Sequence, residues 1–147
     1  MNVWLGLDLG TKRVGVAIAD EQMRIATPLK TIAIRGREHL VEELNHILAQ
    51  YQVTEIVVGL PKTLTGDVGP AARKVMAEVH WLQGRLQPPL VLWDERLSSQ
   101  EVERVLLDAD LSRRRRKGIR DQLAAQRILQ NYLDYRQSAG ENSSEMP

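Results

Sequence analysis

Two short apolar runs near the N-terminus, joined by only a few residues, place the tightest limit on how this chain can fold. Residues 3–8 and 14–19 each have the composition of a short buried strand, and Gly10 lies in the turn between them. Because a parallel pair needs a long crossover, these two strands must run antiparallel. A third strand over residues 29–34, after the turn at Pro28, completes a predicted three-stranded meander.

The rest of the chain alternates helical and strand patterns. Apolar residues at helical spacing predict a helix over residues 38–50, and short apolar runs predict strands over 55–59 and 90–93. A loop from residue 60 to 70 precedes a second helix, whose predicted apolar face is Ala72, Val75, Met76, Val79 and Leu82. Ser98 and Glu101 have the spacing of a capping box and predict a third helix, and a last helix is expected from about residue 119 to 135.

This order predicts an α/β fold of one domain. Residues 1–136 should form a five-stranded mixed sheet, an antiparallel meander followed by parallel strands, with helices on both faces. The small polar residues 137–147 are expected to form a disordered tail. The chain has no cysteine, which excludes disulfides, zinc–thiolate sites and iron–sulfur clusters. We find no signal peptide and no apolar run long enough for a membrane helix, so we expect a cytoplasmic protein with no membrane partner.

Acidic residues stand at two predicted strand ends and on the last predicted helix. Asp8 ends the first apolar run, and Asp94 and Glu95 end the last one. A carboxylate at the tip of a buried strand is costly unless it is paired, hydrogen-bonded or bound to a metal. Ligands of open α/β sheets bind beyond the carboxyl ends of the strands, where these acids lie. Strand alternation puts Asp94 and Glu95 on opposite faces, and the pattern alone does not choose between them.

Asp121 is the third acid of interest. An acid in the first turn of a helix can be explained by the helix dipole alone. However, Asp121 shares one helical stripe with Ala125, Ile128 and Tyr132, so it should face the sheet. Three converging carboxylates would form an all-oxygen site of the kind that Mg²⁺ or Mn²⁺ prefers, and such a site suits phosphodiester hydrolysis.

Basic residues adjoin these acids, although the net charge is only +1. Lys12 and Arg13 follow Asp8 in the first turn, and Lys62 lies in the loop after the fourth strand. The run from Arg113 to Lys117 comes just before Asp121, and it is either a solvated flexible loop or a contact for phosphates.

Four motifs in order, GLDLGTKRVGVAIAD, VVGLPKTLTG, WDERLSS and KGIRDQLAAQRILQNYL, resemble the YqgF family, also called RuvX, of the ribonuclease H-like superfamily. The resemblance covers about residues 3–135. It implies a fold like that of the resolvase RuvC and a role either as a Holliday junction resolvase or as a nuclease that processes precursor 16S ribosomal RNA.

Carried over by position, the resemblance implies functional residues of two kinds. The acidic triad, which would be catalytic and hold Mg²⁺ or Mn²⁺, is Asp8, Glu95 and Asp121. The basic residues that the resemblance carries over as contacts for nucleic acid are Lys12, with Arg13 beside it, Arg96 and Lys117. Lys62, in its loop, and Arg115 and Arg116, in the charge run, are expected contacts by their position alone. The arginine run at residues 113–116 is heavier than the family pattern, so its role stays open.

The carboxylates predict a metal-dependent nuclease, and the resemblance implies that it acts in 5′-end maturation of precursor 16S rRNA, with ribosomal particles as further partners. A resolvase of branched DNA and a non-catalytic nucleic-acid-binding module are the alternatives. An actin-like ATPase also shares the Asp-x-Gly-Thr start, but it needs two such domains. RNA or DNA as substrate, one metal ion or two, and monomer or homodimer stay open.

Overall fold

The computed structural model describes the backbone of residues 1–61, 67–94 and 113–145, and the side chains of these residues except 113–119 and 138–145. Its strands are β1 (Val3–Leu9), β2 (Arg13–Asp20), β3 (Thr27–Ala33), β4 (Glu55–Leu60) and β5 (Leu90–Asp94). Its helices are α1 (Arg37–Tyr51), α2 (Pro70–Gln83) and α4 (Arg113–Glu145). The helix predicted at Ser98 falls outside the described residues.

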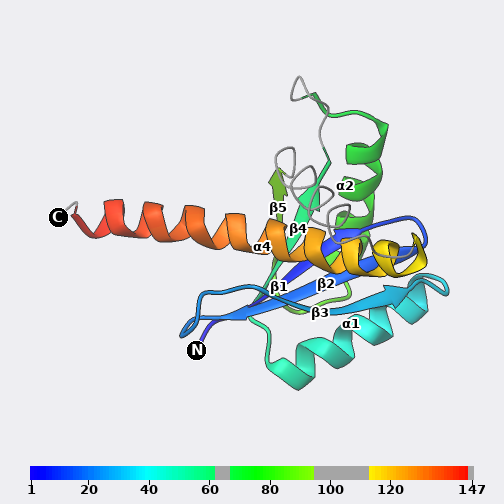
Figure 1. Cartoon of the computed structure of the whole chain (residues 1–147), viewed down its shortest axis with the longest axis horizontal. Helices are drawn as coiled ribbons and strands as arrows, with labels where there is room; N and C mark the ends of the chain where they lie inside the picture. The colour runs from blue at the N-terminus through cyan, green and yellow to red at the C-terminus, as the bar shows by residue number, and fades with distance from the viewer. Residues whose placement is uncertain (62–66, 95–112, 146–147) are drawn as a thin grey trace.

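The five strands form one sheet in the order β3-β2-β1-β4-β5 (Figure 1). β1, β2 and β3 are antiparallel neighbours, whereas β4 lies parallel to β1 and β5 lies parallel to β4. The mixed sheet predicted from the sequence is therefore confirmed. Its two central strands, β1 and β4, end at the same edge because they are parallel, and this edge is called the carboxyl edge below.

Alternate residues of the strands serve two separate cores. On one face, Leu5, Leu7 and other strand residues pack with the apolar sides of α1 and α2. On the other face, Trp4, Val57 and Trp93 pack with α4. The predicted apolar face of α2 is buried except at Met76, a residue that is 42% exposed. Met76 follows Val75 directly, about 100° further around the helix, which turns it away from the sheet.

α4 packs very closely on the sheet because glycine occupies two of the positions below it. A Cβ atom on Gly6 would lie 2.8 Å from Cβ of Leu129 and 2.9 Å from the carbonyl oxygen of Ala125. A Cβ atom on Gly15 would overlap the backbone of Asp121. Only residues without a side chain allow a helix backbone this near to the strands.

α4 extends beyond the predicted helix at both ends. It begins at Arg113, so the backbone of the arginine run is helical and does not form a loop. Asp121 therefore lies more than two turns into the helix, where the helix dipole no longer accounts for it. The sequence predicts that this helix ends near residue 135, whereas its backbone continues to Glu145 (Figure 1). Each residue added to a formed helix gains a backbone hydrogen bond, so polar residues can extend one without burial. In the part of the chain that the structure describes, no helix has the length and apolarity to span a membrane.

Candidate active site

Asp8 lies near the carboxyl edge, at the end of β1, on the sheet face that α4 covers. It follows Leu7, which belongs to the opposite core, and it shares the face of Trp4 and Gly6. Its side chain is half-buried. Burial, and next the negative charge of Asp121, raise the pKa of the Asp8 carboxyl from 3.8 to about 6. A carboxyl group with this pKa is poised to exchange a proton for a cation near neutral pH.

The register of the first hairpin brings Asp121 over Asp8. Asp8 pairs with Gly15 across β1 and β2, and Gly15 lies directly beneath the backbone of Asp121. Because Gly15 has no side chain, α4 can pack close enough to β2 to place Asp121 near Asp8. Two of the three predicted acids thus converge, from a strand end and a helix 113 residues apart in the sequence.

Arg13 holds the Asp121 carboxylate. Its Nε donates a hydrogen bond to Oδ2 of Asp121 over 2.8 Å, from two residues before Gly15 on the same face of β2. The Asp121 side chain is 22% exposed, so this pair is partly screened by water. Arg13 is expected from the sequence to contact nucleic acid, whereas the contact that the structure describes is with Asp121 of the acidic site.

Asp8 and Asp121 have the chemistry of a magnesium site. Both offer carboxylate oxygens, the ligands that Mg²⁺ and Mn²⁺ prefer, and a divalent cation between them would offset the repulsion that raises the pKa of Asp8. Within residues 1–61, 67–94 and the described side chains of α4, no group of three potential metal ligands forms. A third protein ligand would therefore come from residues outside this description.

Asp94 lies on the wrong face of the sheet to be that ligand. Leu90 and Leu92 of β5 pack in the core under α1 and α2, whereas Val91 and Trp93 pack toward α4. Strand alternation places Asp94 with Leu92, on the face opposite Asp8. Of the two acids that the sequence left open, this observation disfavours Asp94. Glu95 itself lies outside the described residues.

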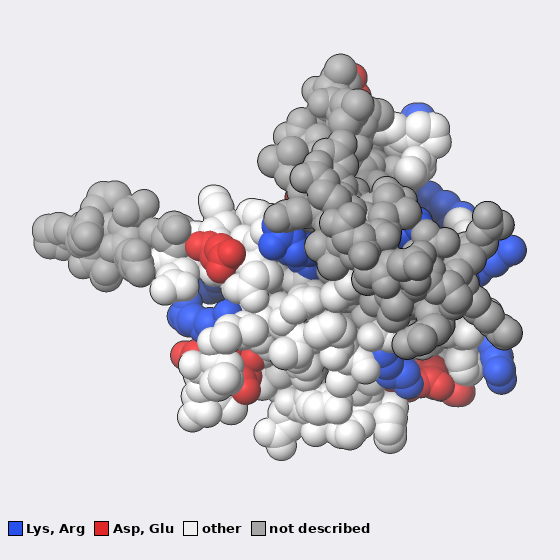
Figure 2. Space-filling model, viewed as in Figure 1, with Lys and Arg blue, Asp and Glu red and all other residues white. Residues whose placement is uncertain are grey.

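The remaining predicted contacts with nucleic acid are only partly described. Lys12 is exposed in the turn that follows β1, and its side chain makes no ion pair with any described residue. Lys62 and Arg96 lie outside the described residues. Arg115, Arg116 and Lys117 lie in the first turns of α4 by their backbone alone. Figure 2 shows several groups of Lys and Arg near the end of the molecule where α4 begins.

Two hydrogen bonds that the sequence did not predict hold α4 on the meander. Nε2 of Gln122 donates a hydrogen bond to the Thr31 hydroxyl, and Nε2 of Gln126 donates one to the carbonyl of Ala26. One feature of the sequence does indicate that a helix packs closely on β2. Small residues occupy alternate positions of this strand, at Gly15, Ala17 and Ala19.

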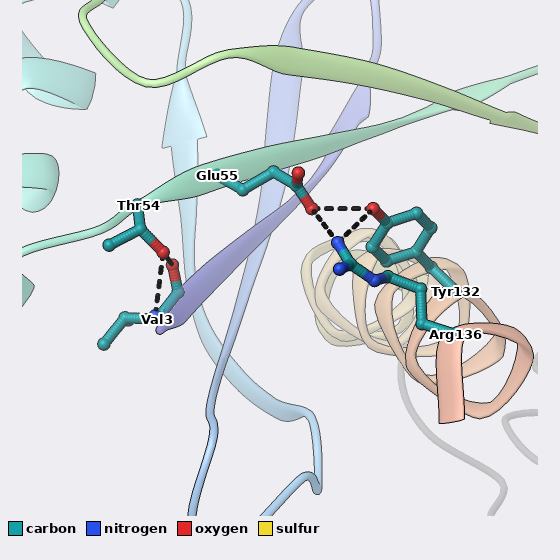
Figure 3. A network of polar contacts seen from close by, with 5 residues as sticks. All are labelled: Val3, Thr54, Glu55, Tyr132 and Arg136. Atoms are coloured by element: carbon teal, nitrogen blue, oxygen red, sulfur yellow. Dashed lines mark hydrogen bonds and ion pairs between the residues drawn. The ribbon is translucent and has the colours of Figure 1, made fainter. Parts of the chain in front are cut away.

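A second polar cluster joins α4 to the start of β4, away from the acids. The Tyr132 hydroxyl donates to Oε1 of Glu55 over 2.7 Å, and Nη1 of Arg136 donates to the same oxygen over 3.3 Å (Figure 3). Burial, and next the bond to Glu55, raise the pKa of the Tyr132 hydroxyl. Tyr132 also packs edge-on against Trp93. This cluster anchors the C-terminal half of α4 to the sheet. It thereby helps to set the orientation of the whole helix, including the part that carries Asp121.

Comparison with known proteins identifies the family. The family model described as "RuvX: Holliday junction resolvase" matches residues 2–135. The chain belongs to the RuvX family. Relatives of this RuvX-family chain named "Putative pre-16S rRNA nuclease" include one from Thermoanaerobacter pseudethanolicus, 47% identical over 88% of this chain and 94% of its own. Another, from Geobacillus sp. (strain WCH70), is 46% identical over 90% of this chain and 98% of its own.

Solved structures share the fold of this RuvX-family chain. T. thermophilus RuvC in complex with a Holliday junction substrate aligns with a TM-score of 0.55 at 12% identity, over 93% of this chain and 96% of RuvC. Fowlpox virus resolvase, in a complex with Holliday junction DNA, aligns with a TM-score of 0.54 at 10% identity, over 90% of this chain and 97% of the resolvase. The RuvC-like ribonuclease H fold expected from the sequence is thus confirmed.

Proposed function

We propose that this protein is a metal-dependent nuclease that hydrolyses phosphodiester bonds in an active site containing Asp8 and Asp121. Its proposed role is the 5′-end maturation of precursor 16S rRNA. One observation carries the chemical part of the proposal, which is the approach of these two carboxylates at the carboxyl edge, with the pKa of Asp8 raised to about 6. Nothing in packing requires two acids to meet there, and their repulsion is a cost that a bound cation would offset.

The chain's own residues have separate tasks in this mechanism. Asp8 and Asp121, with Glu95 as the proposed third ligand, would hold one or two Mg²⁺ or Mn²⁺ ions. A metal bound there lowers the pKa of an attacking water and stabilises the leaving oxygen. Arg13 keeps the Asp121 carboxylate in place through its 2.8 Å hydrogen bond. Lys12, at the tip of the turn, would neutralise a phosphate next to the cleaved one.

The substrate assignment rests on the relatives. They are named for precursor 16S rRNA and are about as long as this chain, since it covers 94% and 98% of the two described above. The family description names a Holliday junction resolvase, and the same site chemistry would cleave branched DNA. A precursor 16S rRNA in a ribosomal particle is the preferred substrate of this proposal, and a DNA junction is the alternative.

The proposal is tested by offering four substrates side by side, in one buffer with Mg²⁺. These are a precursor 16S rRNA fragment, single-stranded DNA, duplex DNA and a four-way junction. We expect cleavage of the rRNA precursor at a defined 5′ position. Preferred cleavage of the junction would instead favour the resolvase, and cleavage of none of them would refute the nuclease.

Matched variants show whether the activity belongs to this site. Asp8→Asn should lower the cleavage rate by at least about 100-fold, because it removes a ligand charge rather than a residue that supports a ligand. Asp134→Asn makes the same change at an exposed position of α4 and should leave the rate unchanged. Equal rates in the two variants would place the cleavage elsewhere or in a contaminant.

A further inference from the structure

A small cleft lies beside the β1–β2 turn, on the sheet face opposite Asp8. It has a volume of about 120 Å³ and is bounded by β1, β2 and the turn between them, and by α1 and α2. Its floor is apolar and consists of Leu9, Val14, Ile34 and Leu40. Sites for whole drug-sized ligands begin at about 300 Å³, so this cleft has room for one small ring and not for a larger molecule.

The rim of the cleft is polar and carries a net positive charge. Gly10 and Thr11 of the turn form one side, and Arg37, Lys74 and Glu78 form the other. Glu78 is already neutralised, since its Oε1 accepts a hydrogen bond from Nη2 of Arg37 over 2.9 Å.

Lys74 is the cation of this rim that is available to a ligand. Its side chain is exposed, and it makes no hydrogen bond or ion pair with the described part of the chain. The guanidinium of Arg37, by contrast, is held between Glu78 and the ring of Trp81, whose centroid is 4.9 Å away. The rim thus combines a cation that is held in place with one that no described group holds.

The cleft is within reach of a strand bound at the acidic site. Leu9 lines it, and Leu9 follows Asp8 directly on β1, so the two side chains point to opposite faces of the sheet. Gly10 is two residues after Asp8, and two residues of a strand span roughly 7 Å. Because Gly10 also forms part of the rim, the cleft begins about this far from Asp8. A polynucleotide that leaves Asp8 therefore crosses the short Gly10–Thr11 turn, next to Lys12, and arrives at Lys74.

From this arrangement we infer that the cleft holds one unpaired nucleotide of the bound strand, with its base on the apolar floor and its phosphate against Lys74. A base in so small a cleft has no room for a pairing partner, so the strand must be single or locally unpaired at this position. The inference rests on the proposed function for the direction of the strand. The test of the cleft measures only binding of a strand and not its cleavage. The cleft inference and the proposed nuclease function can therefore fail separately.

Binding is measured by fluorescence anisotropy with a labelled eight-nucleotide single strand, in EDTA so that no metal-dependent cleavage occurs. Lys74→Ala should weaken binding about fivefold at 0.1 M salt, as expected when one phosphate contact on a single strand is lost, and should lower the log–log salt slope by about 0.7. Arg73→Ala is the matched control, because Arg73 is the neighbouring exposed cation of α2 and does not line the cleft. Equal effects of the two variants would overturn the inference.

The position of the base is tested with strands that carry one abasic nucleotide at each position in turn. We expect a loss of affinity concentrated at one position, and a blunt duplex of the same sequence should show no effect of Lys74→Ala. An even profile along the strand, or an equal loss for the duplex, would contradict a base in the cleft. If the wild-type protein cleaves none of the substrates but still loses affinity at a single abasic position, the proposed nuclease function is refuted and the assignment of the cleft stands.

Discussion

Asp8 is ionised at neutral pH at a cost to the folded protein, because burial and Asp121 both oppose its charge. Its pKa in the folded state, about 6, lies above the ordinary value of 3.8. The folded protein therefore binds this proton more tightly than the unfolded chain does. As a result, the free energy of unfolding falls as the pH rises from about 3.8 to about 6, and it is constant above that range. At roughly 1.4 kcal/mol per pKa unit the full cost reaches about 3 kcal/mol.

Asp8→Asn removes this cost, so the variant should be more stable than the wild type in the absence of metal. We expect a gain in the free energy of unfolding of on the order of 1–3 kcal/mol above pH 6, falling toward zero near pH 4. Denaturant titrations of both proteins in EDTA, from pH 4 to pH 8, measure it. A variant that is less stable throughout, or a difference that does not change with pH, would contradict the environment described for Asp8.

Arg13 and Lys12 are adjacent cations for which the structure predicts different kinetic effects. Arg13→Ala releases Asp121, and loss of a residue that orients a metal ligand lowers activity by on the order of 10–100-fold. Lys12→Ala should instead weaken binding and leave the rate at saturating substrate nearly unchanged. Steady-state kinetics on the same rRNA fragment separate the two effects. Equal changes in KM alone for both variants would mean that Arg13 contacts substrate and does not position Asp121.

At the scale of elements, the contact of α4 with β2 depends on the absence of a side chain at Gly15. Gly15→Ala would drive a methyl group into the backbone of Asp121, and neither partner is a flexible side chain that could move aside. We expect a loss of at least about 1–3 kcal/mol in the free energy of unfolding, as for an overpacked core, together with loss of cleavage. Thermal denaturation with an activity assay measures both.

Gly84→Ala is the control for the glycine substitution. Gly84 follows α2 with φ of −78°, and a Cβ atom there would have no neighbour within 4 Å. Alanine at such a position should be neutral or stabilise the protein by about 0.4–1 kcal/mol, chiefly through the unfolded chain. Similar losses in the two variants would mean that α4 does not lie on Gly15 as described.

The order and type of the described elements could be predicted from the sequence, because periodicity and loop length are local properties. The short first turn fixed an antiparallel hairpin, and the stripe of Ala125, Ile128 and Tyr132 fixed the buried face of α4. The start of α4 could not be predicted, since a run of arginines is compatible with a loop or with a helix. The pairing of Arg13 with Asp121 was also beyond the sequence, because it depends on how deeply a helix sits over a glycine.

Across the described part of the molecule, unpaired cations lie at the β1–β2 turn although the net charge of the chain is only +1. Lys12 and Lys74 lie at the β1–β2 turn with no ion pair to a described residue, whereas Arg13 is paired with Asp121, and Arg136 is paired with Glu55 at the opposite end of β4. A polyanion should therefore bind beside this turn, with the phosphates nearest Lys12 and Lys74 neutralised. For two such contacts on a single strand we expect a log–log salt slope of about −1.4, measured by anisotropy from 0.05 to 0.3 M salt. Binding that does not change with salt would contradict this charged surface.

The proposed function depends on a divalent cation held between Asp8 and Asp121. The most direct measurement is anomalous diffraction from crystals of the protein soaked in Mn²⁺, with Asp8→Asn crystals soaked alongside. We expect a peak between the two carboxylates in the wild type that is lost in the variant. Wild-type crystals with both side chains ordered and no peak between them would contradict the metal site and the mechanism built on it.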